Sequence, residues 1–298
     1  MSTLNYRRFG RWVCLLAIVA VFLGSATQTL ASGPSSLVLY LPMHEGEGNV
    51  AHDLSGFGND GDITGATWTA DGLSGNALSF DGSGDYIKCS DDPTLNPGTG
   101  SWTVEAWFKT STEARQGLLV KDDGTDGYYL DIYDYRELHF LVRESGSYDK
   151  IVGTTRDLHD GQWHQAVGVR DESNGKLYLY LDGAPDAAPV EAVNTAGGDV
   201  APSVDCYLGN LGSTGSFQFR GTMDEVRVYS RALSASEILQ RYEDAMSAFG
   251  GQDAPEEPAA VSGLTIWGSA AAAVALLIAA PLLLRRRAPA RSIIRRRQ

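Results

Sequence analysis

The sequence of 298 residues predicts an all-β domain, a sandwich of two antiparallel sheets with one short C-terminal helix, followed by a single transmembrane helix. Three observations predict this organisation. Short runs of alternating apolar and polar residues recur between clusters of Gly, Asp, Asn and Ser, which is typical of sandwiches and barrels. An apolar segment near each end matches an export signal or a membrane span. All the acidic residues lie between these two segments.

The alternating runs form one domain, because no internal repeat or long linker interrupts residues 36–246. The clearest strands are predicted at residues 37–41, 77–80, 85–88, 103–109, 128–133, 137–143 and 222–229, with further strands marked by Val167 and Val169 and by Leu177, Leu179 and Leu181. Side chains of a strand alternate between its two sides, so the apolar set in each run is predicted to be the buried face.

A single helix is predicted over residues 235–246. Ser234 and Glu237 have the spacing of a capping box, and Leu233 and Ile238 have that of the hydrophobic staple. We expect this helix to pack across one end of the sandwich.

Residues 1–31 are predicted to be a secretory signal peptide. Arg7, Arg8 and Arg11 precede an apolar run of 12 residues, and small residues before Ala31 offer a cleavage site, with residues 24–26 as a competitor. The run is too short to span a bilayer, which needs about 20 residues. The alternative is a retained N-terminal anchor.

Residues 264–284 are predicted to cross the membrane, because these 21 residues carry no charge and Arg285, Arg286 and Arg287 follow directly. The basic tail of residues 285–298 would then lie in the cytoplasm, and the domain of residues 32–247 outside the cell. Residues 248–263 read as a flexible stalk. A surface-sorting tail is the alternative, although no LPxTG motif occurs and residues 255–258 only approach a Pro-Glu-Pro motif.

Charge is divided along the chain in the same way. Residues 32–259 contain 14 basic and all 37 acidic residues, so their net charge is −23. A surface of this charge repels nucleic acid and anionic lipid headgroups, which excludes both as partners of the domain.

Two cysteines, Cys89 and Cys206, remain after removal of the signal peptide. An even pair in an oxidising compartment predicts a disulfide, provided that their strands are neighbours. The spacing of the pair matches no metal-binding pattern.

Several stretches, in this order, resemble the laminin-G-like, concanavalin-A-like jelly-roll family. Residues 53–61 read DLSGFGNDG, residues 80–87 contain FDG and DYI, and residues 103–108 read TVEAWF. WHQAV at 163–167, LYLDG at 179–183 and FRGTMDEVRVYSRALS at 219–234 follow. The resemblance implies a two-sheet jelly roll that binds carbohydrate or protein ligands at a cell surface and holds a structural calcium ion.

The resemblance also implies a calcium site formed by Asp53, in the early loop, and Asp224, in the closing strand, with Glu45 or Glu47 as further ligands. Calcium prefers several oxygen ligands, which an acidic, glycine-rich loop supplies. The alternative is that Asp53 caps a turn and that Asp224 pairs with Arg227 or Arg231. A second acidic loop, residues 122–127, lacks the EF-hand spacing and is interpreted as a solvated turn.

A ligand face is predicted on the strand sides opposite the apolar sets. Its proposed members are Trp107, Tyr129, Tyr133, His164, Tyr178 and Tyr180, beside Asp131, His139 and Arg143. Aromatic rings and hydrogen-bonding groups on one sheet suit sugar binding. Two alternatives are that these aromatic residues only cover a sheet, and that loops at the rim bind the ligand.

The sequence favours binding over catalysis. The sandwich also occurs in glycoside hydrolases, but no Glu-x-Asp-x-x-Glu motif or close variant is present to place two carboxyl groups about 5–5.5 Å apart. The predicted function is therefore adhesion or recognition by a membrane-anchored extracellular module. A glycoside-processing enzyme and a passive structural protein of the envelope are the alternatives.

Overall fold

The structure, a computed structural model, describes residues 36–133, 137–195, 197–212 and 216–250. One sheet, called sheet A, is formed by β1 (Leu37–Leu41), β4 (Thr67–Thr69), β5 (Ala77–Asp81), β7 (Trp102–Lys109), β12 (His164–Asp171), β13 (Lys176–Leu181), β14 (Ala184–Pro185), β15 (Val190–Glu191) and β17 (Arg220–Tyr229). The other, sheet B, is formed by β2 (Val50–Ala51), β3 (Gly61–Thr64), β6 (Tyr86–Cys89), β8 (Gln116–Asp122), β9 (Gly127–Ile132), β10 (Leu138–Glu144), β11 (Ser147–Val152) and β16 (Cys206–Leu208). A 3-10 turn, η1 (Pro93–Leu95), and one α-helix, α1 (Ala235–Gly250), complete the described elements.

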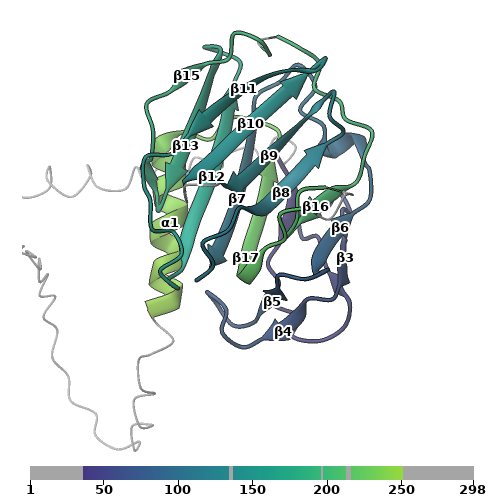
Figure 1. The fold of residues 1–298 in the computed structure, drawn as a ribbon, viewed down its shortest axis with the longest axis vertical. Helices are drawn as coiled ribbons and strands as arrows, with labels where there is room; N and C mark the ends of the chain where they lie inside the picture. Colours follow the sequence, from purple (N-terminus) through teal and green to yellow (C-terminus); the bar gives the residue numbers. More distant parts are fainter. Residues whose placement is uncertain (1–35, 134–136, 196, 213–215, 251–298) are drawn as a thin grey trace, which may run out of the picture. The chain divides into compact units, whose positions relative to one another are not determined.

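The two sheets form two antiparallel layers, seen nearly face-on in Figure 1. Sheet A has the order β14-β13-β12-β7-β17-β5-β4, with β1 also paired to β17 and β15 to β13. Sheet B has the order β11-β10-β9-β8-β16-β6-β3-β2. Strands that neighbour one another in each sheet come from distant parts of the sequence. The predicted two-sheet sandwich with one short helix is confirmed.

The core lies between the inner faces of the two sheets. The predicted apolar sets of β7, β9 and β10 all point into it, and their members are at most 2 % exposed. Packing is close enough to require glycine at position 168 of β12, because a Cβ there would lie 2.4 Å from the ring of Phe140. Burial of these apolar side chains is the main source of the sandwich's stability.

One predicted apolar set faces the other way. Val167 and Val169 of β12 lie on the outer face of sheet A, in a cluster with Leu233 and Ile238 around α1. Ala166 and Gly168 of the same strand face the core instead. Both sides of β12 are buried, so alternation alone does not show which side faces the opposite sheet.

The helix α1 lies along the outer face of sheet A, beside β12 and β13 (Figure 1). Tyr242, Met246 and Phe249 of its second half pack against Trp107 and Trp163. The rings of Trp107 and Tyr242 are stacked, with centroids 5.6 Å apart and an interplanar angle of 2°. This helix therefore covers the part of the outer face of sheet A that lies over β7, β12 and β13.

The predicted capping box is confirmed. Glu237 N donates to Ser234 Oγ at 3.3 Å, and Ser234 N donates to Glu237 Oε2 at 2.8 Å. A hydrogen bond from Arg231 is the largest of the effects that lower the pKa of Glu237 to about 2. Leu233 and Ile238 are buried together, as the staple requires.

The predicted disulfide is absent from the structure. Cys89 on β6 and Cys206 on β16 are directly opposite each other, so the strand neighbourhood that a disulfide needs is present, but both are free thiols. Each is fully buried, and burial raises the pKa of Cys206 to about 12 and that of Cys89 well above its usual value. Since the thiolate is the reactive form, the two residues act here as small apolar core residues.

The segments predicted to be a signal peptide (1–31), the membrane span (264–284) and the basic tail (285–298) lie outside the described residues, as does most of the predicted stalk. Among the helices that the structure describes, none combines the length and apolarity needed to cross a membrane.

The capping box provides a first prediction. Ser234→Ala removes the hydroxyl that caps α1, so we expect it to lower the free energy of unfolding by about 1 kcal/mol. Urea denaturation of the full chain measures this. Ser247→Ala, an exposed change inside the same helix, is the control and is expected to leave stability nearly unchanged; an equal loss in both variants would contradict the capping role.

Candidate functional site

The structure separates the six residues of the predicted ligand face. Trp107 and Tyr180 lie beneath α1 on the outer face of sheet A, where they are 0 % and 7 % exposed, and Tyr178 packs at the edge of the same cluster. The prediction of one shared face is therefore wrong for these three residues. A helix that covers a sheet needs apolar and aromatic side chains beneath it, and this pattern is the same as that of an aromatic ligand platform.

His164 also has a different position from the predicted one. Its ring lies on the core side of β12, 5.8 Å from the ring of Phe108. Nδ1 is 2.9 Å from Asp182 Oδ2, and Nε2 is 3.3 Å from Asp160 Oδ1. Burial acts to lower the pKa of His164, but the hydrogen bonds and negative charges of the two aspartates outweigh it and raise the pKa. His164 thus links β12 to two turns.

The outer face of sheet B, called the open face below, is covered by no helix within the described residues. Strand register arranges its side chains in rows across the sheet. The central row, from β11 to β3, consists of Lys150, Leu141, Tyr129, Val120, Tyr207, Lys88 and Asp62. Flanking rows contain Val152, His139 and Asp131 on one side and Tyr148, Arg143 and Asp122 on the other.

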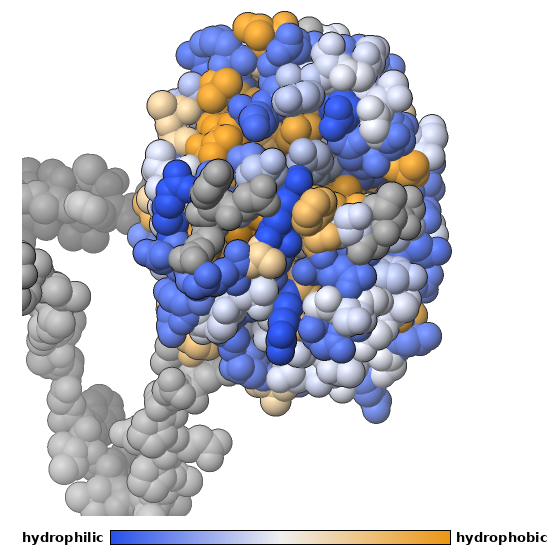
Figure 2. All heavy atoms as spheres, viewed as in Figure 1, coloured by the Kyte–Doolittle hydropathy of each residue, from blue (hydrophilic) through white to orange (hydrophobic). Residues whose placement is uncertain are grey.

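Figure 2 shows hydrophobic side chains scattered among hydrophilic ones on the side of the molecule where β8 to β11 lie. Of the predicted ligand-face residues, Tyr129 and Tyr133 lie on the open face, together with Asp131, His139 and Arg143. Burial and the charge of Asp131 raise the pKa of Tyr129 to about 12, so its hydroxyl stays protonated as a hydrogen-bond donor.

A stack of flat groups stands at one end of the open face. The rings of Tyr133 and His139 are 4.3 Å apart and nearly parallel, at 11°. The guanidinium carbon of Arg115 lies 4.4 Å from the centroid of Tyr133 and 4.3 Å from that of Phe217. Phe217 is 46 % exposed, so its ring is available to a ligand. No sequence pattern indicated Arg115 or Phe217, which reach this stack from loops beside the sheet.

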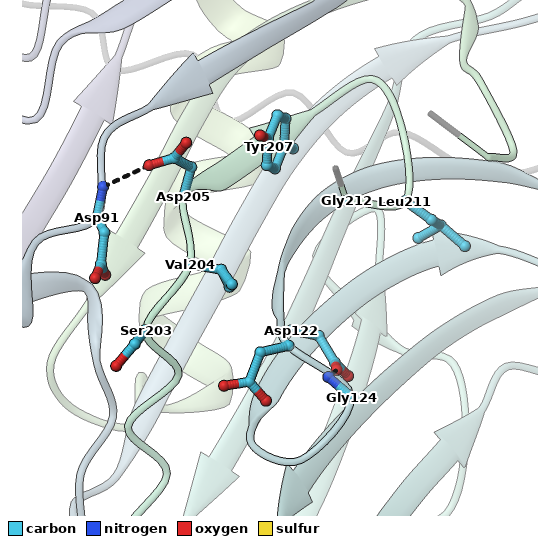
Figure 3. A pocket seen from close by; sticks show the side chains of 10 residues that line it. Asp91, Asp122, Gly124, Ser203, Val204, Asp205, Tyr207, Leu211 and Gly212 are labelled. Atoms are coloured by element: carbon cyan, nitrogen blue, oxygen red, sulfur yellow. Dashed lines mark hydrogen bonds between the residues drawn. The ribbon is translucent and has the colours of Figure 1, made fainter. Parts of the chain in front are cut away.

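A pocket of about 550 Å³ opens beside Tyr207, at the other end of the rows (Figure 3). Its acidic lining residues are Asp91, Asp122, Asp123 and Asp205. The residues of the 122–127 loop form the β8–β9 turn, in which Asp122 and Asp123 accept backbone N–H groups.

Positive side chains compensate part of this acidity. The buried Lys121 Nζ is 2.6 Å from Asp91 Oδ1, and Arg143 Nε is 3.0 Å from Asp122 Oδ2. The turn interpretation of this loop is therefore supported.

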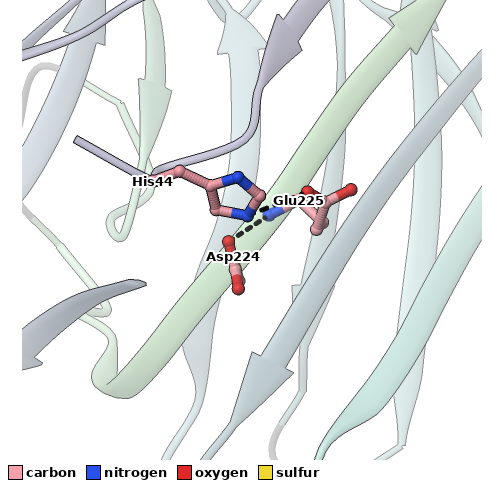
Figure 4. A group of neighbouring side chains, drawn as sticks. All are labelled: His44, Asp224 and Glu225. Carbon is pink, nitrogen blue, oxygen red and sulfur yellow. Dashed lines mark hydrogen bonds and ion pairs between the residues drawn. The ribbon is translucent and has the colours of Figure 1, made fainter. Parts of the chain in front are cut away.

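A second group of polar side chains lies on the other sheet, at an irregularity of β17. Imidazole and carboxylate atoms of His44, Asp224 and Glu225 lie within 4.8 Å of one another (Figure 4). Two residues, Glu225 and Val226, oppose the single Ala106 of β7, which makes this a β-bulge. Glu225 has a φ of 53°, in the left-handed region. Such a backbone costs about 1–3 kcal/mol and redirects a side chain that would otherwise point away from Asp224.

Charge is poorly compensated at Asp224. Its carboxylate is fully buried, and it accepts the N–H groups of Leu73 at 2.9 Å and of Glu225 at 2.9 Å. Burial, and then the charge of Glu225, raise the pKa of Asp224 to about 8. Glu225 itself contacts Arg227 and accepts the Tyr40 hydroxyl at 3.1 Å. The predicted alternative, a pairing of Asp224 with Arg227, does not occur; the arginine pairs with Glu225.

Asp53 takes no part in this group. Its two carboxylate oxygens accept N–H groups of Tyr40, Ser55 and Asn59 and the Ser55 hydroxyl, all at 2.7–2.9 Å. The carboxylate thus organises its own loop, as the turn-capping alternative predicts. Glu45 Oε1 accepts His52 N at 2.7 Å, and Glu47 is exposed.

The donor set at Asp224 fits a cation in its charge. Two adjacent carboxylates and a raised carboxyl pKa mark a place where positive charge would stabilise the ionised form. His44, whose side chain is 42 % exposed, borders the group on its solvent side. An imidazole ligand is unusual for calcium, which prefers oxygen, so Asp224 and Glu225 are the residues here that suit it.

Comparison with known proteins identifies the family. Residues 81–239, more than half of the chain, match the laminin-G model of the concanavalin A-like lectin/glucanases superfamily, and the chain belongs to this superfamily. Neurexin 1 of Drosophila melanogaster is 28 % identical over 112 residues, which cover 37 % of this chain and 6 % of neurexin 1.

Solved structures show the same fold. The binding domain of Paraclostridial Mosquitocidal Protein 1 is 16 % identical with a TM-score of 0.58, and the match covers 70 % of this chain and 52 % of that domain. The serotype D botulinum neurotoxin ligand-binding domain in complex with N-acetylneuraminic acid is 15 % identical with a TM-score of 0.55, over 70 % of this chain and 51 % of that domain. The chain therefore spans about half of these toxin domains and a small part of neurexin 1.

The environment of His164 predicts a pH effect on stability. A histidine whose pKa is raised by folding contributes stability that is full below its unfolded pKa of about 6.5 and is lost as pH rises through the folded value. We expect the melting temperature of the full chain to fall with pH in this window, and His164→Gln to reduce the fall. His52→Gln, at an exposed site, is the control. An unchanged slope in His164→Gln would contradict the assignment.

Proposed function

We propose that the protein is an extracellular recognition module that binds carbohydrate through the open face of sheet B. The observation that carries this proposal is the asymmetry of the sandwich. The outer face of sheet A is covered by α1 over β7, β12 and β13, whereas that of sheet B carries rows of Tyr, Lys, Arg and Asp side chains with no helix over them among the described residues. Tyr rings can pack against sugar rings, and the polar groups beside them can bind hydroxyls.

The relatives support a binding role. A botulinum serotype D ligand-binding domain of this fold was solved with N-acetylneuraminic acid, and other toxin relatives are receptor-binding domains. A sandwich similar to this one is therefore able to bind a sugar. A protein ligand is the second candidate, favoured by the match to neurexin 1.

The carboxylates near the Tyr133 stack and at the β17 bulge favour binding over glycoside hydrolysis. On the open face, Asp131 is paired with Arg115, and Glu137 at its edge with Arg156. Asp224 and Glu225 are close to each other, but Asp224 is fully buried and Glu225 is 8 % exposed, so a sugar cannot reach between them. A hydrolase needs two carboxyl groups that both reach the glycosidic bond.

We further propose that the module is exported and anchored. This proposal rests on the sequence of the two ends, with a signal peptide in residues 1–31 and a membrane span in residues 264–284. Cleavage of the first segment and extraction of the chain with membranes are the measurements that test it.

The open-face proposal predicts which tyrosines matter. Tyr129→Ala with Tyr133→Ala is expected to weaken retention of the full chain on a glycan array by more than tenfold, because two stacking and hydrogen-bonding groups are lost. Tyr178→Ala with Tyr180→Ala, on the face beneath α1, is the matched control and is expected to retain binding once folded. Loss in the control pair alone would move the site to sheet A, and loss in neither would move it to the loops.

We also propose that Asp224 and Glu225, beside His44, hold a structural calcium ion. The buried carboxylate of Asp224, with its raised pKa, supports a cation at this bulge. Bound calcium would supply the positive charge that the protein itself does not provide to Asp224.

The calcium proposal predicts that millimolar calcium raises the melting temperature of the full chain above its value in EDTA. Asp224→Asn is expected to remove this difference, because it removes a ligand charge. Asp53→Asn is expected to keep the difference, since Asp53 organises a separate loop. Equal melting temperatures with calcium and with EDTA in the unmodified chain would overturn the proposal.

A further inference from the structure

We propose that the glycan bound at the open face carries a carboxylate, and that Arg115 and Lys150 hold this carboxylate beside Tyr133 and Phe217. The inference rests on the proposed function and adds the chemical class of the ligand. It starts from two basic side chains whose hydrogen-bonding capacity and charge are not fully used within the protein.

Arg115 has hydrogen-bond donors that no described residue accepts from. Its Nε donates to Asp131 Oδ2 at 2.8 Å, and among the described residues its two Nη groups have no acceptor. The guanidinium is held in place by the rings of Tyr133 and Phe217, and 17 % of the side chain remains exposed. A guanidinium that is already oriented binds a carboxylate with two parallel hydrogen bonds at little entropic cost.

Lys150 is the second cation. Its exposed ammonium lies 5.9 Å from the centroid of Tyr133, the same ring that Arg115 contacts. It forms no ion pair with any residue that the structure describes. Two positive groups around one ring repel each other, and an anion placed against both would remove this repulsion.

The nearby acids compensate only part of this charge. Asp131 is buried against Arg115, Glu137 is paired with Arg156, and Asp122 is paired with Arg143. A local positive surplus is unusual in a domain whose net charge is −23. The acidic remainder of the surface repels anions, and the exposed Lys150 gives the Tyr133 stack a positive charge that no described acid pairs with.

The neighbouring groups favour a sugar acid among anions. Phe217 is 46 % exposed and offers an apolar ring, on which the C–H side of a pyranose can pack. In a sugar acid the carboxylate is attached to that same ring, so one residue of the glycan would reach both Phe217 and the two cations. The planar fork of Arg115 matches a planar carboxylate better than a tetrahedral sulfate.

Matched probes test the charge of the ligand directly. Oligogalacturonate and sialyllactose are each compared with their methyl esters, which keep the sugar ring and remove the charge, and a sulfated oligosaccharide and poly-glutamate complete the panel. We expect at least one of the two acids to bind the full chain about tenfold more tightly than its ester, which is a difference of about 1.4 kcal/mol. Added salt should reduce this preference.

Variants test whether the carboxylate binds beside Lys150. Lys150→Gln is expected to lower the affinity for the acid about tenfold without changing that for the ester, since only a charged partner is lost. Arg220→Gln removes an equal charge from an exposed arginine on β17 of sheet A and is expected to keep the affinity. Circular dichroism is the check that each variant is folded.

Three outcomes would overturn the inference. Equal binding of acid and ester would show that the carboxylate is not recognised, while the open face would remain a glycan site. Equal loss in Lys150→Gln and Arg220→Gln would reduce the effect to overall charge. Tighter binding of the sulfated sugar or of poly-glutamate would replace the sugar acid. Failure of every glycan to bind would instead overturn the proposed function itself.

Discussion

A single buried carboxylate, Glu105, connects the helix α1 to the outer face of sheet A. It is 1 % exposed on β7, where its oxygens bind Arg241 of α1 at 2.7 Å and Gln165 of β12 at 2.9 Å. Arg227 of β17 lies 3.8 Å away. A carboxylate removed from water is tolerated only with such partners, so Glu105 ties the helix to three central strands of sheet A. The aromatic cluster beneath α1 lies beside this polar contact, and among the described residues no helix covers the outer face of sheet B.

The same arrangement explains what could be predicted from the sequence. The apolar sets of β7, β9 and β10 were predictable because each strand has one face in the core, and alternation reports that directly. The capping box of α1 was predictable because its contacts are three residues apart. The strands β8 and β11 were not found, since both combine apolar residues with Lys and Asp. Cys89 and Cys206 lie on neighbouring strands, as a disulfide requires, but the predicted disulfide is absent and both are free thiols.

The site was less predictable, for a reason that Tyr180 and Tyr129 illustrate. Each tyrosine occupies a strand position that points away from the core. Tyr180 is nevertheless buried by a helix, whereas Tyr129 is partly exposed. Which outer face a helix covers is decided by contacts between residues far apart in the sequence, such as Glu105 with Arg241. Asp224 and Glu225 show a similar limit, because neighbouring residues share one side of a strand only when a bulge rotates the backbone.

The open face also has a separate place in the evolution of the chain. Side chains beneath α1 must fit a helix on one side and a strand on the other, so a change there disturbs packing in two layers. The exposed positions of the open face, such as Lys150 and Tyr148, do not have to fit a second layer. They can be exchanged at small cost in stability. A lineage of proteins could therefore keep this scaffold and its covered sheet while acquiring new ligands, one strand register position at a time.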